Sequence, residues 1–182
     1  MKFCIECGAS SVSFRIPHGD NRPRSVCDNC DYIHYLNPKS VCGTLPIHDG
    51  KILLCKREIQ PRAGYWTLPA GFMENGETLQ GASVRETFEE ANAQAVDPKL
   101  YSVFSLPHIN QVHFFYKCGI EDGIFSAGSE TLEAQLFEIN NIPWDELAFK
   151  TITRCLEQYV EDCQTNSFPM HIEDILVNPH QA

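Results

Sequence analysis

The sequence has no apolar stretch that approaches the roughly 20 residues a membrane-spanning helix needs. Its first residues, Met1–Cys7, also lack the apolar segment and the small-residue cleavage site of a secretory signal. We therefore expect a cytoplasmic protein with no membrane partner.

Positive charge is scarce as well. The chain carries 14 lysine and arginine residues against 24 aspartate and glutamate residues, and its formal net charge is -10. Such a surface repels the phosphates of nucleic acid, so a nucleic-acid partner is not expected. A small anionic substrate is compatible with this charge if bound cations reverse the field locally.

Repeats, low-complexity tracts and Gly/Ser-rich linkers are also absent. A chain of 182 residues is long enough for one substantial core with a small unit beside it. The first 36 residues are turn-rich and cysteine-bearing, and Pro38 disfavours helix in the residue before it. We therefore expect a small unit over 1–36, a main domain over 37–164 and a tail over 165–182.

Nine cysteines are present, and an odd number cannot all pair in internal disulfides. Cys4 and Cys7 form one CxxC pair, Cys27 and Cys30 form another, and 19 residues separate the pairs. This spacing is typical of a four-thiolate zinc site. Four thiolates complete the shell of the ion, so we expect structural Zn²⁺ that stabilises a unit too small to fold on its core alone.

The main domain shows the patterns of both strands and helices. Branched and aromatic residues predict strands over 40–48, 51–56, 100–106, 111–117 and 135–139, and Asp49-Gly50 predicts a tight hairpin. Apolar periodicity and capping residues predict helices over 78–91, between Thr78 and Asn92, and over 149–162, with Pro143 opening the second helical stretch. Together these elements predict an α+β sandwich with helices beside a mainly antiparallel sheet.

Three carboxylates gather on the first predicted helix. Glu86, Glu89 and Glu90 occupy positions i, i+3 and i+4 and therefore project from one face, where Arg85 can pair with Glu89. Carboxylates this close repel one another unless a divalent cation neutralises them, and Mg²⁺ (or Mn²⁺) prefers such oxygen ligands. A solvated acidic surface gives the same local pattern, so the helix alone leaves both interpretations open.

The residues around the helix add a longer pattern. Residues 71–93, GFMENGETLQGASVRETFEEANA, resemble the Nudix hydrolase signature Gx5Ex7REUxEExGU. Thr87 stands at its apolar position and Asn92 at its last glycine, and asparagine tolerates the left-handed geometry that a glycine provides. The resemblance extends over about 37–150. It implies the Nudix α/β/α sandwich and the activity of a pyrophosphohydrolase. In such an enzyme, metal ions screen the negative charge of the diphosphate, so that a hydroxide ion can approach the phosphorus.

The resemblance also implies a set of site residues. Metal ligands and catalytic carboxylates would be Ala70 (through its carbonyl), Glu77, Glu86, Glu89, Glu90 and Glu133. Gly71 and Arg85 would support this arrangement. Glu130 is a rival to Glu133, and which glutamate acts as the general base is left open.

Basic and aromatic residues just before the signature are candidates for substrate binding. Lys56, Arg57 and Arg62 could hold phosphate oxygens, although solubilising surface charge explains them equally well. Trp66 could stack on an aromatic ring, although core packing explains most such side chains.

A zinc ribbon ahead of a Nudix domain resembles two groups of enzymes. The NADH pyrophosphatases, some of which remove NAD caps from RNA, carry an SQPWPFPxS-like segment that this sequence lacks. The segments FCIECG, CKREIQPRAGYWTLPAGFME and ETLEAQLF are instead similar to the group related to the plant chloroplast FAD pyrophosphatase, which also acts on ADP-ribose. The resemblance thus favours FAD, cleaved to FMN and AMP, with ADP-ribose next and NADH or NAD-capped RNA as the alternative.

Two further points stay open at the level of sequence. A non-catalytic Nudix sensor, whose zinc ribbon binds nucleic acid or protein, is the alternative to an enzyme. Relatives are often dimers, so a homodimer is also an open expectation.

Overall fold

The computed structural model describes residues 1–176, so residues 177–182 of the expected tail lie outside the described part. The chain divides into two compact units at Asn37 and Pro38, and each is described by itself. Within the described residues, no helix is long and apolar enough to cross a membrane.

The first unit contains a small antiparallel sheet of order β1-β2-β3. Its strands are β1 (Val12–Arg15), β2 (Arg24–Cys27) and β3 (Ile33–His34). Tight turns follow the two cysteine pairs, since Gly8 has a φ of 73° and Asp31 a φ of 57°. These turns bring the pairs together, and the three strands carry no pattern in the sequence that predicts them.

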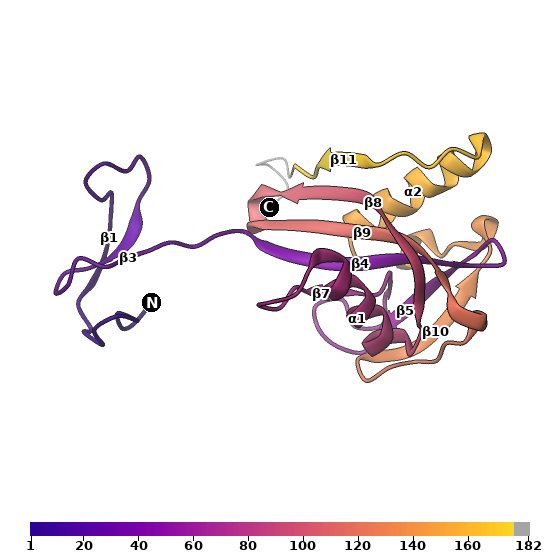
Figure 1. Ribbon diagram of the computed structural model, residues 1–182, viewed down its shortest axis with the longest axis horizontal. Coiled ribbons are helices and arrows are strands. Elements are labelled where there is room, and N and C mark those ends of the chain that lie inside the picture. Colours follow the sequence, from indigo (N-terminus) through magenta and orange to yellow (C-terminus); the bar gives the residue numbers. More distant parts are fainter. Residues whose placement is uncertain (177–182) are drawn as a thin grey trace. The chain divides into compact units, whose positions relative to one another are not determined.

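The second unit is built on a mixed sheet of order β10-β5-β4-β9-β8-β11 (Figure 1). The strands are β4 (Lys39–His48), β5 (Lys51–Arg57), β8 (Ala95–Leu106), β9 (Gln111–Ile120), β10 (Thr131–Phe137) and β11 (His171–Asp174). Two short strands join from the side: β6 (Trp66–Thr67) pairs with β5, and β7 (Ala70–Phe72) pairs with β4. The pairs β4-β9 and β8-β11 are parallel and the others antiparallel.

Strand β4 changes its partner along its length. It forms the predicted hairpin with β5, in which Asp49 and Gly50 both have positive φ, but pairs with β5 only next to the turn. Farther along, Val41–Gly43 pairs with β7 instead. A Cβ atom on Gly43 would overlap Ala70, so glycine allows the close approach of the two strands there. Strand β7 is thereby fixed against the middle of the sheet.

The two helices cover opposite faces of the sheet. Ile52 and Leu54 of β5 belong to a large core that contains one face of α2 (Lys150–Thr165). Leu53 and Cys55, which alternate with them, pack against Ala91 at the end of α1 (Leu79–Ala91). Because successive side chains of a strand point to opposite faces, the predicted α/β/α sandwich is confirmed.

Helix α1 begins and ends where the sequence predicts. The Thr78 hydroxyl accepts a hydrogen bond from the Gly81 N–H at 3.0 Å, and Asn92 ends the helix with a left-handed φ of 45°. Helix α2 begins at Lys150, and the stretch after Pro143 forms only a 3-10 turn. Short 3-10 turns lie at Pro107–Ile109, Glu121–Gly123, Ile139–Asn141 and Trp144–Glu146.

The tail after α2 contributes a strand to the sheet, although the sequence showed no periodic pattern there. Strand β11 pairs in parallel with the edge strand β8. His171 Nε2 lies 2.8 Å from Asp162 Oδ2, which also accepts a 2.7 Å hydrogen bond from the buried Tyr101 hydroxyl. Arg154 Nε lies 3.0 Å from Glu173 Oε1. These contacts tie β11 to α2 and to the sheet.

Candidate metal centre and ligand pocket

Arg85 lies at the centre of the acidic cluster, by which we mean Glu77, Glu86, Glu89 and Glu90. Its Nε donates to Glu77 Oε1 at 2.6 Å, and its Nη1 donates to Glu86 Oε1 at 2.7 Å and to Glu89 Oε2 at 2.9 Å. Its Nη2 donates to the Phe72 carbonyl at 3.1 Å. The guanidinium therefore holds three carboxylates of the acidic cluster against strand β7.

Two of the helix carboxylates pack directly on β7. Glu86 is only 9% exposed, and a Cβ atom on Gly71 would overlap its carboxylate. Glu90 Oε2 accepts a hydrogen bond from the Ala70 N–H at 3.1 Å. Glycine at position 71 therefore leaves room for a carboxylate to approach the strand closely.

The surroundings of these carboxylates shift their pKa values in different directions. Burial raises the pKa of Glu90 to about 7, although the Ala70 N–H opposes this shift, and burial also raises the pKa of Glu86 against the influence of Arg85. The hydrogen bond from Arg85 lowers the pKa of Glu77 to about 2. Two buried carboxylates thus resist ionisation unless more positive charge is supplied, as a divalent cation would do.

The free oxygens of the cluster fit such a cation. Glu86, Glu89 and Glu90 each use one carboxylate oxygen in the bonds above, which leaves the other oxygen of each without a partner in the described part of the chain. Oxygen ligands of this kind suit a hard divalent ion. Among the described residues, only the four cysteines of the first unit bring a group of ligand atoms within 4.8 Å of one another, so the glutamate oxygens stand farther apart than that.

The loop before β10 brings a further glutamate to the cluster. Its Ser126 and Gly128 N–H groups donate to the carbonyls of Ala91 and Glu90, at 2.8 and 3.0 Å, and so cap the end of α1. Glu130 follows in this loop, and its charge contributes to the raised pKa of both Glu86 and Glu90.

Glu133 lies elsewhere. It is exposed on β10, where the neighbouring Ala134 and Leu136 pack on the side of the sheet that faces α1. Because side chains alternate along a strand, Glu133 points to the opposite face. The structure brings Glu130 to the acidic cluster and leaves Glu133 outside it.

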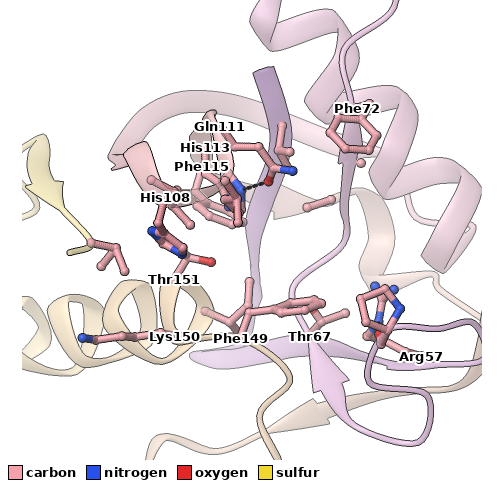
Figure 2. Close-up of a pocket in the computed structure, with 18 residues that line it drawn as sticks. Arg57, Thr67, Phe72, His108, Gln111, His113, Phe115, Phe149, Lys150 and Thr151 are labelled. Atoms are coloured by element: carbon pink, nitrogen blue, oxygen red, sulfur yellow. Dashed lines mark hydrogen bonds between the residues drawn. The ribbon is translucent and has the colours of Figure 1, made fainter. Parts of the chain in front are cut away.

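A cavity of about 450 Å³ adjoins β7. Ala70, Gly71 and Phe72 line it, as do residues of β9 and the first turn of α2. Figure 2 shows Arg57 and Phe72 toward one side of the cavity and His108 and Thr151 toward the other. Strand β7 is therefore shared between the acidic cluster and the cavity.

The cavity is mainly apolar and contains a few polar groups. Phe115 and Phe149 supply aromatic surface. His113 Nε2 donates to Gln111 Oε1 at 2.9 Å, since an amide oxygen can only accept. Burial lowers the pKa of His113 to about 4, so the ring is neutral at pH 7. This composition is typical of a site for a small organic molecule.

Of the four residues predicted to bind substrate, Arg57 lines the cavity. Its guanidinium lies 5.1 Å from the Phe149 ring centroid, and its charge lowers the pKa of Glu90. Trp66 is only 5% exposed and packs in the core, with its ring centroid 4.9 Å from that of Phe137. Trp66 is therefore not available for stacking on a ligand.

The other two basic residues lie beside aromatic rings away from the cavity lining. Lys56 Nζ is 5.4 Å from the Trp66 ring centroid, and Arg62 Cζ is 5.3 Å from that of Tyr65. Of these three basic residues, only Arg57 therefore lines the cavity. The contributions of Gln111, Phe149 and Thr151 were missed, because each is an ordinary polar or aromatic residue with no distinguishing spacing.

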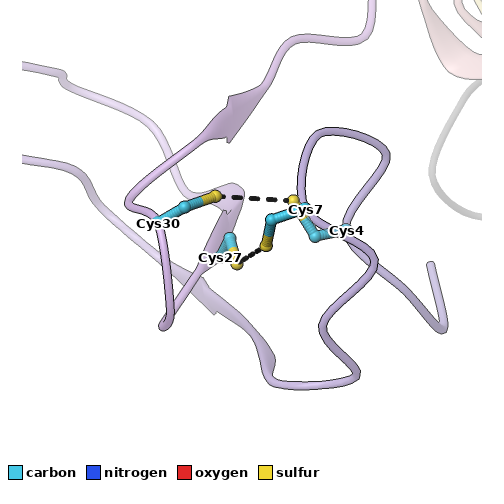
Figure 3. A group of neighbouring side chains, drawn as sticks. All are labelled: Cys4, Cys7, Cys27 and Cys30. Carbon is cyan, nitrogen blue, oxygen red and sulfur yellow. Dashed lines mark hydrogen bonds between the residues drawn. The ribbon is translucent and has the colours of Figure 1, made fainter.

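The four cysteines of the first unit converge on one point, as Figure 3 shows. Their sulfur atoms all lie within 4.8 Å of one another, with 3.7 Å between Cys4 and Cys30 and 3.6 Å between Cys7 and Cys27. A tetrahedral zinc ion with Zn–S bonds of about 2.3 Å places its sulfurs roughly 3.8 Å apart. The cluster therefore fits a structural zinc ion, as the cysteine spacing predicted.

Comparison with known proteins agrees with this geometry. Residues 38–157 match the family model described as NUDIX domain, and residues 2–36 match the zinc-ribbon model described as Nudix N-terminal. The chain is 36% identical over 124 residues to the ADP-ribose pyrophosphatase of Methanocaldococcus jannaschii, covering 65% of this chain and 71% of that protein. It is 27% identical over 169 residues to the NAD-capped RNA hydrolase NudC of Vibrio atlanticus, covering 92% of this chain but only 60% of that protein.

A solved structure shares the fold across both units. The crystal structure of a NUDIX hydrolase from Nitrosomonas europaea matches with a TM-score of 0.92 at 47% identity, and the match covers 96% of this chain and 99% of that one.

Proposed function

The chain belongs to the Nudix hydrolase family and carries its N-terminal zinc ribbon, and on this premise we propose that it hydrolyses the diphosphate of FAD to give FMN and AMP. ADP-ribose is the second proposed substrate. The name of the archaeal relative supports ADP-ribose, and that of NudC supports a substrate related to NAD. FAD is favoured by the sequence segments quoted above, and the aromatic cavity beside β7 is consistent with a ring-bearing substrate.

The observation that carries the proposal is the acidic cluster packed on β7, the strand that also lines the cavity. Mg²⁺ is the proposed cation, and we assign its binding to Ala70 (carbonyl), Glu77, Glu86, Glu89 and Glu90. When bound, this cation would neutralise diphosphate charge and supply an activated water. The acidic cluster, which contacts β7, would bind the cation, and the cavity, which β7 also lines, would bind the organic part of the substrate.

Arg85 and Arg57 have different proposed roles. Arg85 keeps Glu77, Glu86 and Glu89 in place through the hydrogen bonds described above. Arg57, which lines the cavity near Glu90, is proposed to contact a phosphate oxygen. Both guanidiniums reduce the electrostatic cost of bringing a diphosphate to four glutamates.

We propose Glu130, in place of Glu133, as the further carboxylate of the site. Its charge raises the pKa of both Glu86 and Glu90. Its loop is anchored on α1 and on the residue that follows β5, because the Glu58 N–H donates to the Glu130 carbonyl at 2.9 Å. The two residues form a matched pair for mutagenesis. Glu130→Gln is expected to lower kcat by about 100-fold or more, and Glu133→Gln by less than about threefold. The reverse order would contradict this assignment.

The substrate assignment is tested with purified protein, Mg²⁺ and four compounds: FAD, ADP-ribose, NADH and NAD-capped RNA. We expect the highest kcat/KM for FAD. A kcat/KM for NADH that exceeds that for FAD by about tenfold would overturn the flavin assignment, because one factor of ten is a difference of about 1.4 kcal/mol in transition-state binding. Absence of cleavage for all four compounds would favour the sensor alternative.

The metal-site assignment is tested with Glu89→Gln. Turnover should be lost while the fold and the zinc content are retained, because only a ligand of the proposed catalytic cation is removed. Glu161→Gln, which alters an exposed glutamate of the other helix, serves as the control. Near-full activity of Glu89→Gln would remove Glu89 from the proposed site.

A further inference from the structure

Thr151 has a feature that hydrolysis at β7 does not explain. It is only 2% exposed, and its hydroxyl oxygen is the one buried side-chain polar atom in the described residues that has no hydrogen-bond partner. Buried polar atoms are nearly always paired, so an unpaired one calls for an explanation. Thr153, two residues later, is paired in the usual way and donates to the Phe149 carbonyl.

The unpaired hydroxyl faces the cavity. Thr151 lines it, together with its neighbours in the first turn of α2, and Figure 2 shows the hydroxyl oxygen directed from the helix into the cavity. This end lies across the cavity from Arg57. A molecule whose diphosphate is held near Arg57 and β7 would extend its other end toward Thr151.

The first turn of α2 adds further donors at the same place. The N-cap residue is Phe149, whose side chain cannot accept a hydrogen bond, so no side chain caps the N–H groups of this turn. The start of a helix also carries partial positive charge. The Thr151 hydroxyl and the uncapped turn therefore both favour a hydrogen-bond acceptor.

The apolar lining of this end suits an acceptor that is part of an uncharged ring. Lys150 is the one lysine among the lining residues of the described part, and Figure 2 shows its exposed side chain with the ammonium group at the end that points away from Phe149. His113 is neutral. Phe115 and Phe149 offer flat apolar surface that suits an aromatic ring.

We propose that Thr151 is a specificity-determining residue, whose hydroxyl and uncapped helix turn bind a carbonyl oxygen on an uncharged heterocyclic ring joined to the diphosphate. This inference rests on the proposed function and narrows it. It selects dinucleotides whose second half ends in a carbonyl-bearing ring, as in FAD or NADH, over ADP-ribose, which ends in a sugar.

The test compares Thr151→Val, which keeps the shape and removes the hydroxyl, with Thr151→Ser, which keeps the hydroxyl. For the ring-bearing substrate that the wild type cleaves, Thr151→Val should lower kcat/KM about 5- to 20-fold, mainly through KM. Thr151→Ser should stay within about twofold, and kcat/KM for ADP-ribose should not change in either variant. The melting temperature of Thr151→Val should not fall, because no hydrogen bond within the protein is lost.

Two results would overturn the inference and leave the hydrolase proposal intact. An equal loss of kcat/KM for ADP-ribose would mean that the hydroxyl contacts the adenosine diphosphate that FAD, NADH and ADP-ribose share. Unchanged kinetics for all three compounds would show that the hydroxyl contacts none of them. If the wild type cleaves none of the three, the hydrolase proposal fails instead. Titration of FMN fluorescence then still tests Thr151: weaker binding by Thr151→Val than by the wild type supports the inference, and equal binding overturns it.

Discussion

At the scale of single residues, Gly71 is the glycine on which the carboxylate of Glu86 packs. An added methyl group would overlap the Glu86 carboxylate, and Glu86 is held in place by Arg85. We predict that Gly71→Ala lowers the free energy of unfolding by about 1–3 kcal/mol and lowers kcat at least about tenfold, because the carboxylate has to move. Chemical denaturation and steady-state kinetics measure the two effects.

A second variant separates steric overlap from any other effect of the alanine. Glu86→Asp shortens the side chain, so it should recover part of the lost stability when combined with Gly71→Ala. If the double variant is no more stable than Gly71→Ala alone, the overlap with Glu86 is not the cause.

His113 provides a prediction about pH. Its pKa is lowered to about 4 by burial, whereas an unfolded histidine has a pKa of about 6.5. Between these values the unfolded chain binds a proton that the folded chain does not, so the free energy of unfolding decreases as the pH falls from about 6.5 to about 4. His113→Gln should therefore lose less stability than the wild type between about pH 7 and pH 5.

Thermal unfolding at the two pH values measures this difference. His18→Gln, at an exposed histidine of the first unit, should keep the dependence of the wild type. A wild-type slope in His113→Gln would show that another group titrates in this range.

At the scale of elements, β11 is the strand whose contribution can be removed most simply. It carries an Arg154–Glu173 ion pair and a His171–Asp162 hydrogen bond to α2, and Ile175 just after it is 3% exposed, belongs to the main core and lines the cavity. Burial of one such side chain contributes about 1.5–3 kcal/mol. A chain that ends at Asn166 should therefore be at least about 2 kcal/mol less stable than one that ends at Leu176, and its KM should rise.

Denaturant unfolding and kinetics of the two truncated chains provide the measurement, and neither chain contains residues 177–182. Equal stability of the two would mean that β11 adds nothing to the fold.

The elements that the sequence predicted well are those defined by local chemistry. Thr78 and Asn92 mark the ends of α1, and Asp49-Gly50 marks the hairpin, because caps and turns depend on neighbouring residues. Strands β7 and β11 were missed because they are short and exist through distant partners, namely β4 and β8. Pro143 suggested an early start of α2, but the chain makes a separate 3-10 turn before the helix.

The site divides in the same way. Glu86, Glu89 and Glu90 follow from helical spacing, and the structure brings them together. The choice between Glu130 and Glu133 depends on where the loop before β10 ends and on which face of β10 each side chain lies. The sequence did not reveal either point. The cavity is formed by residues from six separate segments, so no spacing along the chain could have identified it.

At the scale of the whole molecule, the chain consists of a zinc-ribbon unit and a Nudix unit that has its own core. We expect about one equivalent of zinc per chain, bound by four thiolates in the first unit. Removal of zinc, by a chelator or by Cys27→Ser, should unfold residues 1–37 and leave the second unit folded, because the small sheet has few buried residues of its own.

Metal analysis and hydrogen exchange followed by mass spectrometry test this. Exchange protection should disappear from the first unit and persist in β4, β5 and β9. Simultaneous loss of protection in both units would show that they unfold together.

The double use of strand β7 has a consequence for redesign. A mutation in Ala70 or Gly71 disturbs the glutamates and the cavity at once, since both residues touch each of them. Lys150 and Thr151, in the first turn of α2, line the cavity, whereas Ile152 in the same turn also belongs to the main core. A library that randomises positions 150 and 151 can therefore search for new substrates while the acidic cluster is held constant, so the fold keeps what can be altered on a different element from what must stay fixed.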